Sequence, residues 1–390
     1  MLIKSIVSSF RREMREIASD KLYLSILVLF PAIMSLFFCV IFYRGAIVDI
    51  PIVVVDRDYT PLSRQLLEMV NSTSGVSIAY QEQDMASAEQ RLLNGDVEGI
   101  LYIDRGFEVD VYRGESAKVG CYLSGANISA SGVLSRDIQL AVQSFAAGVA
   151  LQSLESLGVN EAQAMVEIMP INICSQIISN PYLNYGYYLA PIFMVLGVVI
   201  FTVLSTIYAI GRELRYATAS EWLAEVRGSL LGGVVGKLLP VTIAMSLMSQ
   251  FIYFVLFVVM GMECVGNYLV LSLVTVLFIV VYEGVALAII ALTANLRLAL
   301  SLGGGYSVMA FTFSGITFPT IAMFGVARLF SKLFPLSYFS EFFVSQVMRG
   351  APLSYDIDNL LYMMLFLVVV PLSWRRLGRV VRDGKYWGRE

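Results

Sequence analysis

Long runs of apolar residues with almost no charge constrain this chain more than any other feature of its sequence. A helix needs about 20 mostly apolar residues to cross the roughly 30 Å hydrocarbon core of a bilayer. Segments near this length predict six transmembrane helices, at 22–43, 187–210, 238–261, 268–293, 298–318 and 359–374. The last segment is the shortest, and aromatic residues near its ends fit the headgroup level. The chain is therefore expected to be a polytopic α-helical membrane protein.

The composition supports a membrane protein and excludes several kinds of function. Of the 390 residues, 57% are hydrophobic and 15% are charged, whereas soluble globular proteins carry about 25% charged residues. The net charge is −3, and no stretch combines basic and aromatic residues as a nucleic-acid site does. The chain has no histidine, and its four cysteines lack the spacing of metal ligands. We therefore expect no nucleic-acid partner, no zinc site and no histidine-based catalysis.

The basic residues predict the orientation of the chain, because short cytoplasmic connections carry most of the lysine and arginine. Sixteen basic residues lie in the N-terminal segment, in the connection 211–237, at Arg297 and in the tail 375–390. The short connections on the other side hold three, which are Arg328, Lys332 and Arg349. Both termini, including the basic tail, are thus predicted to be cytoplasmic. The segment 44–185, with 8 basic and 17 acidic residues, is predicted to be extracytoplasmic, because long translocated domains are exempt from this count.

Residues 1–21 are predicted to form an amphipathic helix at the cytoplasmic membrane surface. Apolar residues recur at helical spacing, namely Ile3, Ile6, Val7, Phe10, Met14 and Ile17, and basic residues occupy the other face. Such a stripe is typical of an interfacial helix that lies in the headgroup boundary near anionic lipid. The alternative is an ordinary cytoplasmic segment that leads into the first span.

The segment 44–185 is predicted to be an inserted extracytoplasmic α/β domain. Strands are expected at 52–55, 76–80, 99–103 and 119–123, and helices at 62–70, 86–93 and 128–157. Strands that alternate with helices are typical of a small α/β fold. The segment has no glycine-rich phosphate loop and no catalytic arrangement of serine, aspartate and lysine. We interpret it as a docking or gating element rather than an enzyme.

The connection 211–237 is polar, has helical periodicity and contains Trp222. A large exposed aromatic side chain on a charged cytoplasmic helix favours contact with a protein partner. An equally good interpretation is that Trp222 anchors the chain at the lipid headgroups.

Three features stand out in the membrane part. Gly303, Gly304 and Gly305 weaken a helix by about 1 kcal/mol each relative to alanine, so they mark either a close-packing face or a bend. The stretch 313–335 is too apolar for a solvated loop, and we expect an extracytoplasmic hairpin over 319–357. Glu283 is the one ionisable residue well inside a predicted span, which makes it a candidate functional residue. Its alternative role is structural, as a protonated or hydrogen-bonded glutamate beside a tyrosine.

The order of these parts resembles the ABC-2 type transporter permeases, in the export subgroup with a large extracytoplasmic domain between the first two spans. The similarity covers nearly the whole chain. It rests on four pieces: IVVVDRDYTPL at 52–62; Asn180-Pro181 and Asn184-Tyr185 with Pro191; Arg212-Glu213 to Leu223 with Gly236 to Pro240; and 314–319 with 334–338 and Arg349-Gly350. One departure is Ala217-Thr218, where the family usually has Gly-Thr.

The resemblance implies a permease subunit of an ATP-driven exporter in a bacterial inner membrane, which moves an amphiphilic or hydrophobic substrate, drug-like or lipid-like, outward. It implies a second permease, in a homodimer or a paired heterodimer, and suggests a periplasmic adaptor protein as a further partner. This chain has no G-x-x-x-x-G-K-[ST] loop, so a separate nucleotide-binding subunit would use the ATP, and the chain itself is expected to bind no cofactor and to catalyse no reaction. The docking surface for that subunit is expected at Glu213, Arg215, Thr218, Glu221, Trp222 and Leu223.

Two other classes of function compete with this interpretation. An ion-coupled secondary transporter usually shows internal repeats with interrupted helices, and none is evident here. A sensor of an extracytoplasmic ligand would not explain six spans followed by a short tail. Independently of these classes, Cys121 and Cys174 lie on the predicted oxidising side, where they are candidates for a disulfide.

Overall fold

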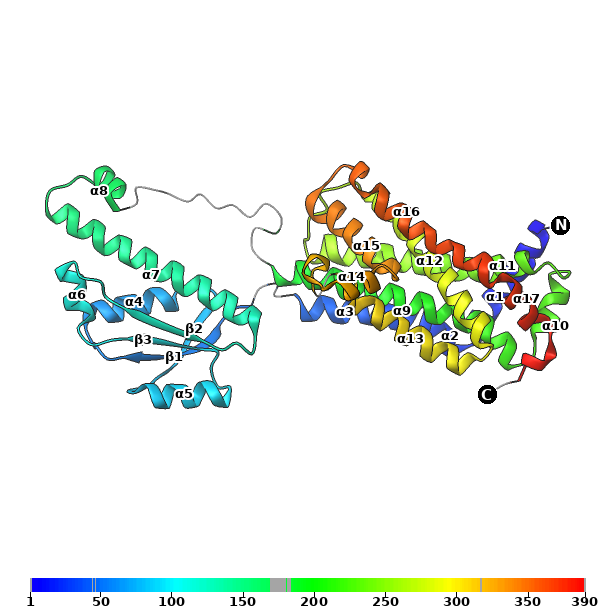
Figure 1. Cartoon of the computed structure of the whole chain (residues 1–390), viewed down its shortest axis with the longest axis horizontal. Coiled ribbons are helices and arrows are strands. Elements are labelled where there is room, and N and C mark those ends of the chain that lie inside the picture. Colours follow the sequence, from blue (N-terminus) through cyan, green and yellow to red (C-terminus); the bar gives the residue numbers. More distant parts are fainter. Residues whose placement is uncertain are drawn as a thin grey trace. The chain divides into compact units, whose positions relative to one another are not determined.

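The computed structural model describes residues 2–43, 45, 47–168, 180, 184–315 and 318–388. The chain folds into two compact units, whose elements are labelled in Figure 1. Met1–Gly45 and Ile178–Glu390 form the first, which we call the membrane unit. Ala46–Ile177 form the second, which we call the α/β unit. Each unit has a hydrophobic core of its own.

A four-stranded mixed sheet forms the centre of the α/β unit, in the order β2-β1-β3-β4. The strands are β1 (Ile50–Asp56), β2 (Val76–Gln81), β3 (Gly99–Ile103) and β4 (Val119–Leu123). β1 pairs in parallel with β2 and β3, and β4 runs antiparallel to β3. The middle of β1 is a run of valines buried on both faces, as is usual for a parallel strand between helices. All four predicted strands are confirmed.

Helices cover both faces of this sheet (Figure 1). α4 (Pro61–Asn71) and α7 (Ile128–Ser156) pack on one face, and α5 (Met85–Asn94) packs on the other. These three helices agree with the prediction. The structure adds α6 (Phe107–Arg113) and α8 (Glu161–Ile168), which are too short for a clear helical pattern.

An acidic turn follows β1 and is held by backbone amides. The Asp56 carboxylate accepts hydrogen bonds from the amides of Asp58 (2.9 Å) and Tyr59 (3.1 Å). The Asp58 carboxylate accepts hydrogen bonds from the amides of Gly106 (2.8 Å) and Glu108 (3.0 Å), where α6 begins. A carboxylate is favourable at a helix N-terminus, so Asp58 fastens this turn to α6.

The same turn also starts α4. Thr60 Oγ1 accepts a hydrogen bond from the Ser63 amide (3.2 Å), and Ser63 Oγ accepts one from the Thr60 amide (3.1 Å), which forms a reciprocal cap. The Thr60 hydroxyl also donates to Asp58 (2.6 Å). Partial burial opposes ionisation of Asp58, but this hydroxyl and the amides of α6 lower its pKa below the ordinary 3.8.

Among the residues that the structure describes, five helices of the membrane unit are long and apolar enough to cross a bilayer. They are Lys21–Ile41, which comprises α2, η1 and α3; α9 (Tyr185–Arg215, of which Gly186–Arg215 is the span); Leu230–Val259, which comprises α11 and η2; α12 (Tyr268–Thr293); and Leu353–Arg382, which contains η5, α16, η6 and α17. Four of them overlap most of the predicted spans at 22–43, 187–210, 238–261 and 268–293. The fifth extends well beyond the predicted 359–374 at both ends.

The remaining predicted span, 298–318, corresponds to the shorter helix α13 (Leu296–Thr312). At 1.5 Å per residue, its 17 residues extend over about 25 Å, which is less than the roughly 30 Å of a hydrocarbon core. The structure therefore supports a polytopic membrane protein with five long apolar helices, and the sixth crossing stays a prediction.

Asparagine side chains fix where three helices of the membrane unit begin. Asn184, Asn267 and Asn295 precede α9, α12 and α13, and each side-chain oxygen accepts a hydrogen bond from an amide of the first turn. This capping satisfies amides that have no partner inside the helix. Polar residues at these positions thus set the boundaries that the apolar pattern alone leaves open.

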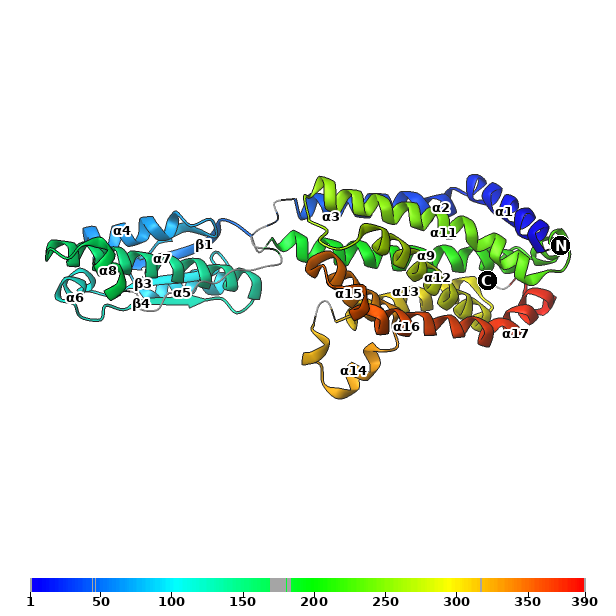
Figure 2. The ribbon, with the colours of Figure 1, turned by 90° about the horizontal axis from the view of Figure 1, so that it is seen from above.

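The predicted hairpin region contains several short helices. These are η3 (Thr320–Ala322), α14 (Gly325–Ser331), α15 (Pro335–Phe343), η4 (Val344–Arg349) and η5 (Leu353–Asp356). α15 is largely buried, whereas α14 projects from the other helices of the membrane unit and exposes Val326 and Leu329 (Figure 2). Cys174 of the predicted disulfide lies outside the described residues, so that pairing stays a prediction.

Candidate coupling site

Small residues bring the N-terminal helix α1 (Leu2–Ser19) into close contact with α11 (Leu230–Phe254). A Cβ atom on Gly236 would lie 2.5 Å from Ser9 Cβ and 2.5 Å from the carbonyl oxygen of Ile6. One on Gly232 would lie 2.7 Å from Ser5 Cβ. Glycines four residues apart are typical of helices whose backbones approach closely in membranes. The polar face of α1, not its apolar stripe, is therefore the face that packs on α11.

α1 packs on α11 through a face that the apolar pattern of the sequence did not indicate. Ser5, Ser9, Glu13 and Ile17 are buried at helical spacing, while Ile3 and other members of the apolar stripe stay exposed. The predicted helix over 1–21 agrees with α1, and its location in the lipid headgroups stays a prediction.

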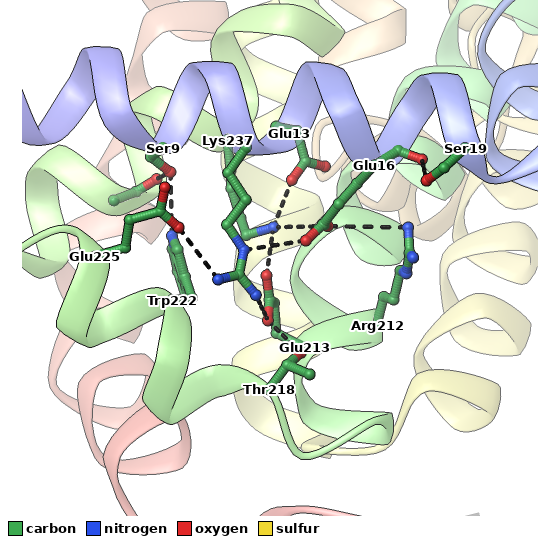
Figure 3. Close-up of polar contacts among 12 residues, drawn as sticks. Ser9, Glu13, Glu16, Ser19, Arg212, Glu213, Thr218, Trp222, Glu225 and Lys237 are labelled. Carbon is green, nitrogen blue, oxygen red and sulfur yellow. Dashed lines mark hydrogen bonds and ion pairs between the residues drawn. The ribbon is translucent and has the colours of Figure 1, made fainter.

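Lys237 of α11 is the centre of a buried ion network between α1, α9 and α11 (Figure 3). Its ammonium contacts the Glu13 carboxylate of α1 and lies 2.9 Å from Glu213 Oε1 of α9. Glu16 of α1 lies 3.5 Å away. Lys237, Glu13 and Glu213 are almost completely buried, so these charges depend on one another. A buried charge without a partner costs several kcal/mol.

Arg12 forms a second layer of the network and extends it to α10 (Ala219–Glu225). Its guanidinium donates to Glu16 (3.0 Å), Glu213 (3.2 Å) and Glu225 (3.3 Å). Glu225 is the last residue of α10, whereas Glu213 lies near the end of α9. One arginine on α1 therefore binds the C-terminal ends of both α9 and α10.

A third group of contacts joins the start of the first span to α9. Asp20 accepts hydrogen bonds from the amides of Leu22 and Tyr23 and from the Tyr208 hydroxyl (2.7 Å), and it lies 3.6 Å from Arg212. Partial burial opposes its ionisation, but the Tyr208 hydroxyl, the amides and Arg212 lower the pKa of Asp20 below the ordinary 3.8.

The network holds more acid than base. Five carboxylates, from Glu13, Glu16, Asp20, Glu213 and Glu225, pair with Lys237, Arg12 and Arg212. Burial raises the pKa of Glu13 above its ordinary 4.5, even though Lys237 favours the charged form. The excess of carboxylates also raises the pKa of Glu13, in the same direction as its burial.

The docking surface expected at 213–223 is only partly a surface. Glu213 and Trp222 are buried, so the expectation of an exposed Trp222 is wrong. The Trp222 indole donates to Ser9 Oγ (3.1 Å), and its ring lies 5.3 Å from the Lys237 ammonium. Trp222 thus packs α10 onto α1 and α11, and neither of these two buried side chains is open to a partner.

The other predicted docking residues lie closer to solvent. Glu221 is exposed, and Arg215, Thr218 and Leu223 are half-buried. The Thr218 hydroxyl donates to the Glu213 carboxylate, so it belongs to the network as well.

The backbone conformation of Ala217 bears on the departure from the family pattern, in which Ala217-Thr218 replaces the usual Gly-Thr. Its φ of 58° lies in the left-handed region, which costs a residue with a side chain about 1 to 2 kcal/mol. Glycine avoids this cost, and glycine is the residue that resembling permeases usually have at this position. The turn between α9 and α10 therefore keeps its conformation without the glycine.

Glu283 of α12 is buried, with 4% of its surface exposed, and lies beside Thr242 of α11. Thr242 Oγ1 lies 2.8 and 3.0 Å from the two carboxyl oxygens and 3.1 Å from the Leu238 carbonyl oxygen. A hydroxyl has one proton to donate, so a protonated Glu283 that donates to Thr242 leaves that proton for Leu238. Within the described residues no basic group pairs with Glu283, and its partner is a threonine rather than the suggested tyrosine.

The three glycines of α13 have different surroundings. A Cβ atom on Gly303 would lie 2.6 Å from Ile207 and 2.8 Å from Val203, so this glycine allows close packing on α9. Gly304 and Gly305 have no atom within 4 Å of such a Cβ position. The helix runs through all three glycines, which agrees with a packing face at Gly303.

A cavity of about 590 Å³ lies between the start of α9, α15 and the segment 344–359. Its lining is largely apolar and aromatic and includes Tyr188, Phe339 and Phe343. Glu341, Arg349 and Asp356 add charged groups. An apolar cavity with a few polar groups is the usual form of a small-molecule site.

Of the three central residues of the network, Glu213 was among the predicted docking residues, whereas Lys237 and Glu13 were not predicted as site residues. Lys237 was counted as a cytoplasmic flank of the third span, but α11 begins at Leu230, so Lys237 lies two turns inside the helix. The spacing Gly232-x-x-x-Gly236 just before it is the signal that indicates a close helix contact.

Two comparisons with known proteins bear on the identity of the chain. A search of curated proteins finds no match. The family described as ABC-2 family transporter protein matches residues 21–374. This range includes the five long apolar helices except the end of the last one, and it includes Arg212, Glu213, Glu225 and Lys237 of the network but not its residues on α1. Within the described residues, no cluster of histidine, cysteine, aspartate and glutamate has the arrangement of a metal site. The chain belongs to the ABC-2 transporter family and is a membrane-spanning permease of an ABC transporter.

Proposed function

We propose that this chain is the permease subunit of an ATP-driven exporter whose ATPase subunit docks on α10 and the connection around it. The buried ion network of Lys237 is the observation that carries the proposal. Family membership supports the ATPase partner and a second permease. ATP is then bound and hydrolysed by the partner, and this chain converts the movement of that partner into movement of its spans.

The network gives such a movement a path. α10 exposes Glu221 on one side and buries Trp222 on the other, against α1 and α11. If α10 moved by itself, Arg12 would be pulled away from Glu225. The buried charges around Lys237 would then be pulled apart as well. Separating paired buried charges is costly, so α1, α9 and α11 are expected to move with α10.

The same helices support a substrate route. α9 contributes Glu213 to the network and Tyr188, Pro191 and Ile192 to the 590 Å³ cavity, so one helix contacts both. The apolar and aromatic lining supports an amphiphilic or hydrophobic substrate, drug-like or lipid-like, that is moved outward.

The docking proposal is tested by reversing one exposed charge. The tagged chain is purified in mild detergent together with its ATPase subunit, and the amount of ATPase per permease is compared with that of Glu221→Lys. An interface residue of ordinary importance predicts a loss of about fivefold or more. Glu263→Lys is the matched control, because Glu263 is also exposed but lies beyond the other end of α11.

Two outcomes would contradict parts of this proposal. Equal ATPase recovery with Glu221→Lys and Glu263→Lys would place docking away from α10. Transport of a lipophilic dye in proteoliposomes without any ATPase subunit, driven by an ion gradient, would favour the ion-coupled alternative. In that case Glu283→Gln should abolish the transport, whereas the exporter proposal expects Glu283 to fasten α12 to α11.

The proposed orientation has both termini in the cytoplasm of a bacterium and the α/β unit outside the inner membrane, where it is available to a periplasmic adaptor. Cys121 is exposed on the α/β unit, which provides a test. In a background that carries Cys174→Ser and Cys264→Ser, a membrane-impermeant maleimide should label intact cells, and the additional change Cys121→Ser should remove the label. Labelling only after the cells are broken open would reverse the orientation. The mass of the purified assembly distinguishes a homodimer from a paired heterodimer.

A further inference from the structure

A basic groove at the C-terminal end of α17 (Val369–Arg382) takes no part in the ion network. Its volume is about 540 Å³, and it lies between α17 and the first residue of α11. The lining residues are Leu230, Trp374, Arg375, Gly378, Arg379, Arg382 and Asp383.

Three arginines give this groove its charge. Arg375, Arg379 and Arg382 follow one another at helical spacing and are exposed. Within the described part of the chain, none of them is paired with a carboxylate. Asp383 is the acidic residue in the lining, so the formal charge of the groove is positive.

The shape of the groove depends on a glycine. Gly378 is buried between the arginine positions, and a Cβ atom on it would lie 3.3 Å from the side chain of Leu230. A larger residue would fill the space between α17 and α11. The groove therefore has an apolar floor from Leu230 and Gly378 and a basic rim.

The groove also lies at the expected depth of lipid headgroups. Two apolar spans end here, since Leu230 begins one and Arg382 ends another. Trp374 is an aromatic type that prefers the membrane interface, and the neighbouring Leu372 is largely exposed. Apolar surface for acyl chains thus continues directly into a basic site of headgroup size.

We propose that this groove binds the phosphate headgroup of an anionic phospholipid, with Arg375, Arg379 and Arg382 as its donors. Arginine binds phosphate oxygens with a planar fork of donors, and basic pockets between membrane helices suit anionic headgroups. The proposal does not depend on docking of an ATPase subunit, because it needs only the lipid, although α17 and α10 lie at the same end of the membrane unit (Figure 1).

The test is native mass spectrometry of the purified full chain with added phosphatidylglycerol and phosphatidylcholine. Wild type should retain phosphatidylglycerol in preference to phosphatidylcholine. Arg379→Gln should weaken phosphatidylglycerol binding about fivefold, and combined replacement of the three arginines should remove the preference. Thermal unfolding in phosphatidylcholine verifies that each variant is folded.

Two further variants separate a built site from general surface charge. Arg376→Gln removes the same charge from the same helix, but Arg376 is bound to the Tyr386 hydroxyl (3.0 Å) and does not line the groove. It should leave lipid binding within about twofold of wild type, whereas equal losses in Arg376→Gln and Arg379→Gln would overturn the proposal. Asp383→Asn should tighten binding about fivefold, a gain that a misfolded protein cannot imitate.

Soluble glycerol phosphate distinguishes the lipid from a free phosphate. The proposal expects it not to displace phosphatidylglycerol, because it lacks the acyl chains that continue along Leu372. Equal binding of glycerol phosphate would overturn the lipid assignment in favour of a soluble anion. Loss of ATPase binding in Arg379→Gln with unchanged lipid binding would overturn it in favour of a protein contact.

Discussion

The membrane unit and the α/β unit each hold buried or half-buried carboxylates, but they stabilise them in different ways. Asp58 of the α/β unit is held mainly by amides of α6 and by the Thr60 hydroxyl, at one end of a single sheet. Glu13 and Glu213 of the membrane unit are held by Lys237 and Arg12, which come from other helices. Backbone amides fix a turn within its own unit, whereas opposite charges join helices that are distant in the sequence. Only the second arrangement makes separate helices depend on one another, as a transmission element requires.

Removing the central cation should have the largest effect. Lys237→Met leaves Glu13 and Glu213 buried without their ammonium, and it should lower the free energy of unfolding by about 3 to 5 kcal/mol. All three tryptophans lie in the membrane unit, so tryptophan fluorescence during denaturant unfolding in detergent reports on that unit.

Two variants control this measurement. Lys332→Met removes an exposed lysine and should change stability by no more than about 0.5 kcal/mol. Adding Glu13→Gln to Lys237→Met should recover part of the loss. A loss below about 1 kcal/mol in Lys237→Met would mean that the buried charges do not tie the helices together.

Separating α1 from α11 should have the next largest effect. Gly236→Ala places a Cβ atom 2.5 Å from a backbone carbonyl of α1, so α1 must shift, at a cost of about 1 to 3 kcal/mol. Gly305→Ala is the control, because its Cβ would meet no atom and alanine stabilises a helix by up to about 1 kcal/mol. Opposite signs in the same unfolding assay are expected, and equal signs would contradict the close packing.

The turn of the α/β unit should respond locally. Asp58→Asn replaces the charge that accepts the α6 amides and should cost about 1 to 2 kcal/mol. Hydrogen–deuterium exchange of the full chain should speed up in the peptides that cover 56–64 and 103–113. Faster exchange in α1 or α10 as well would show that the two units do not respond independently.

A fall in pH should have the smallest effect of these changes. It should act in opposite directions on the Asp58 turn and on the packing of α1. The lowered pKa of Asp58 means that its contribution is present above 3.8 and is lost as the pH falls through the folded value. The raised pKa of Glu13 means that the folded state binds its proton more tightly, so acidification from neutral toward 4.5 stabilises the packing of α1. Exchange corrected for intrinsic rates should thus slow in α1 before it speeds up at 56–64. The reverse order would contradict these assignments.

Much of the fold follows from local patterns. The strands of the α/β unit are runs of β-branched and aromatic residues between turns, and β3 and β4 have the predicted bounds. The first four spans are apolar runs whose ends are polar. Short elements such as α6 were missed, because seven residues hold too little periodicity.

The candidate site could be predicted only in part. The connection 211–237 was identified as important, and the structure places Glu213, Thr218 and Trp222 of this segment in or beside the network. The partners of these residues on α1 are about 200 positions away in the sequence. No local sequence pattern indicates which charged segments will meet when they are so far apart in the chain.

The sequence by itself determined the membrane class, four of the six predicted spans and the main strands and helices of the small α/β unit, because apolar length and side-chain alternation act within about 20 residues. Only the tertiary structure decided that Trp222 is buried and that Lys237 is a buried centre rather than a surface charge. The reason is that burial of a charge depends on partners that folding brings together. Glu13, Glu213 and Lys237 lie on three different helices, and the glycines of α11 bring two of these helices close enough to share their charges.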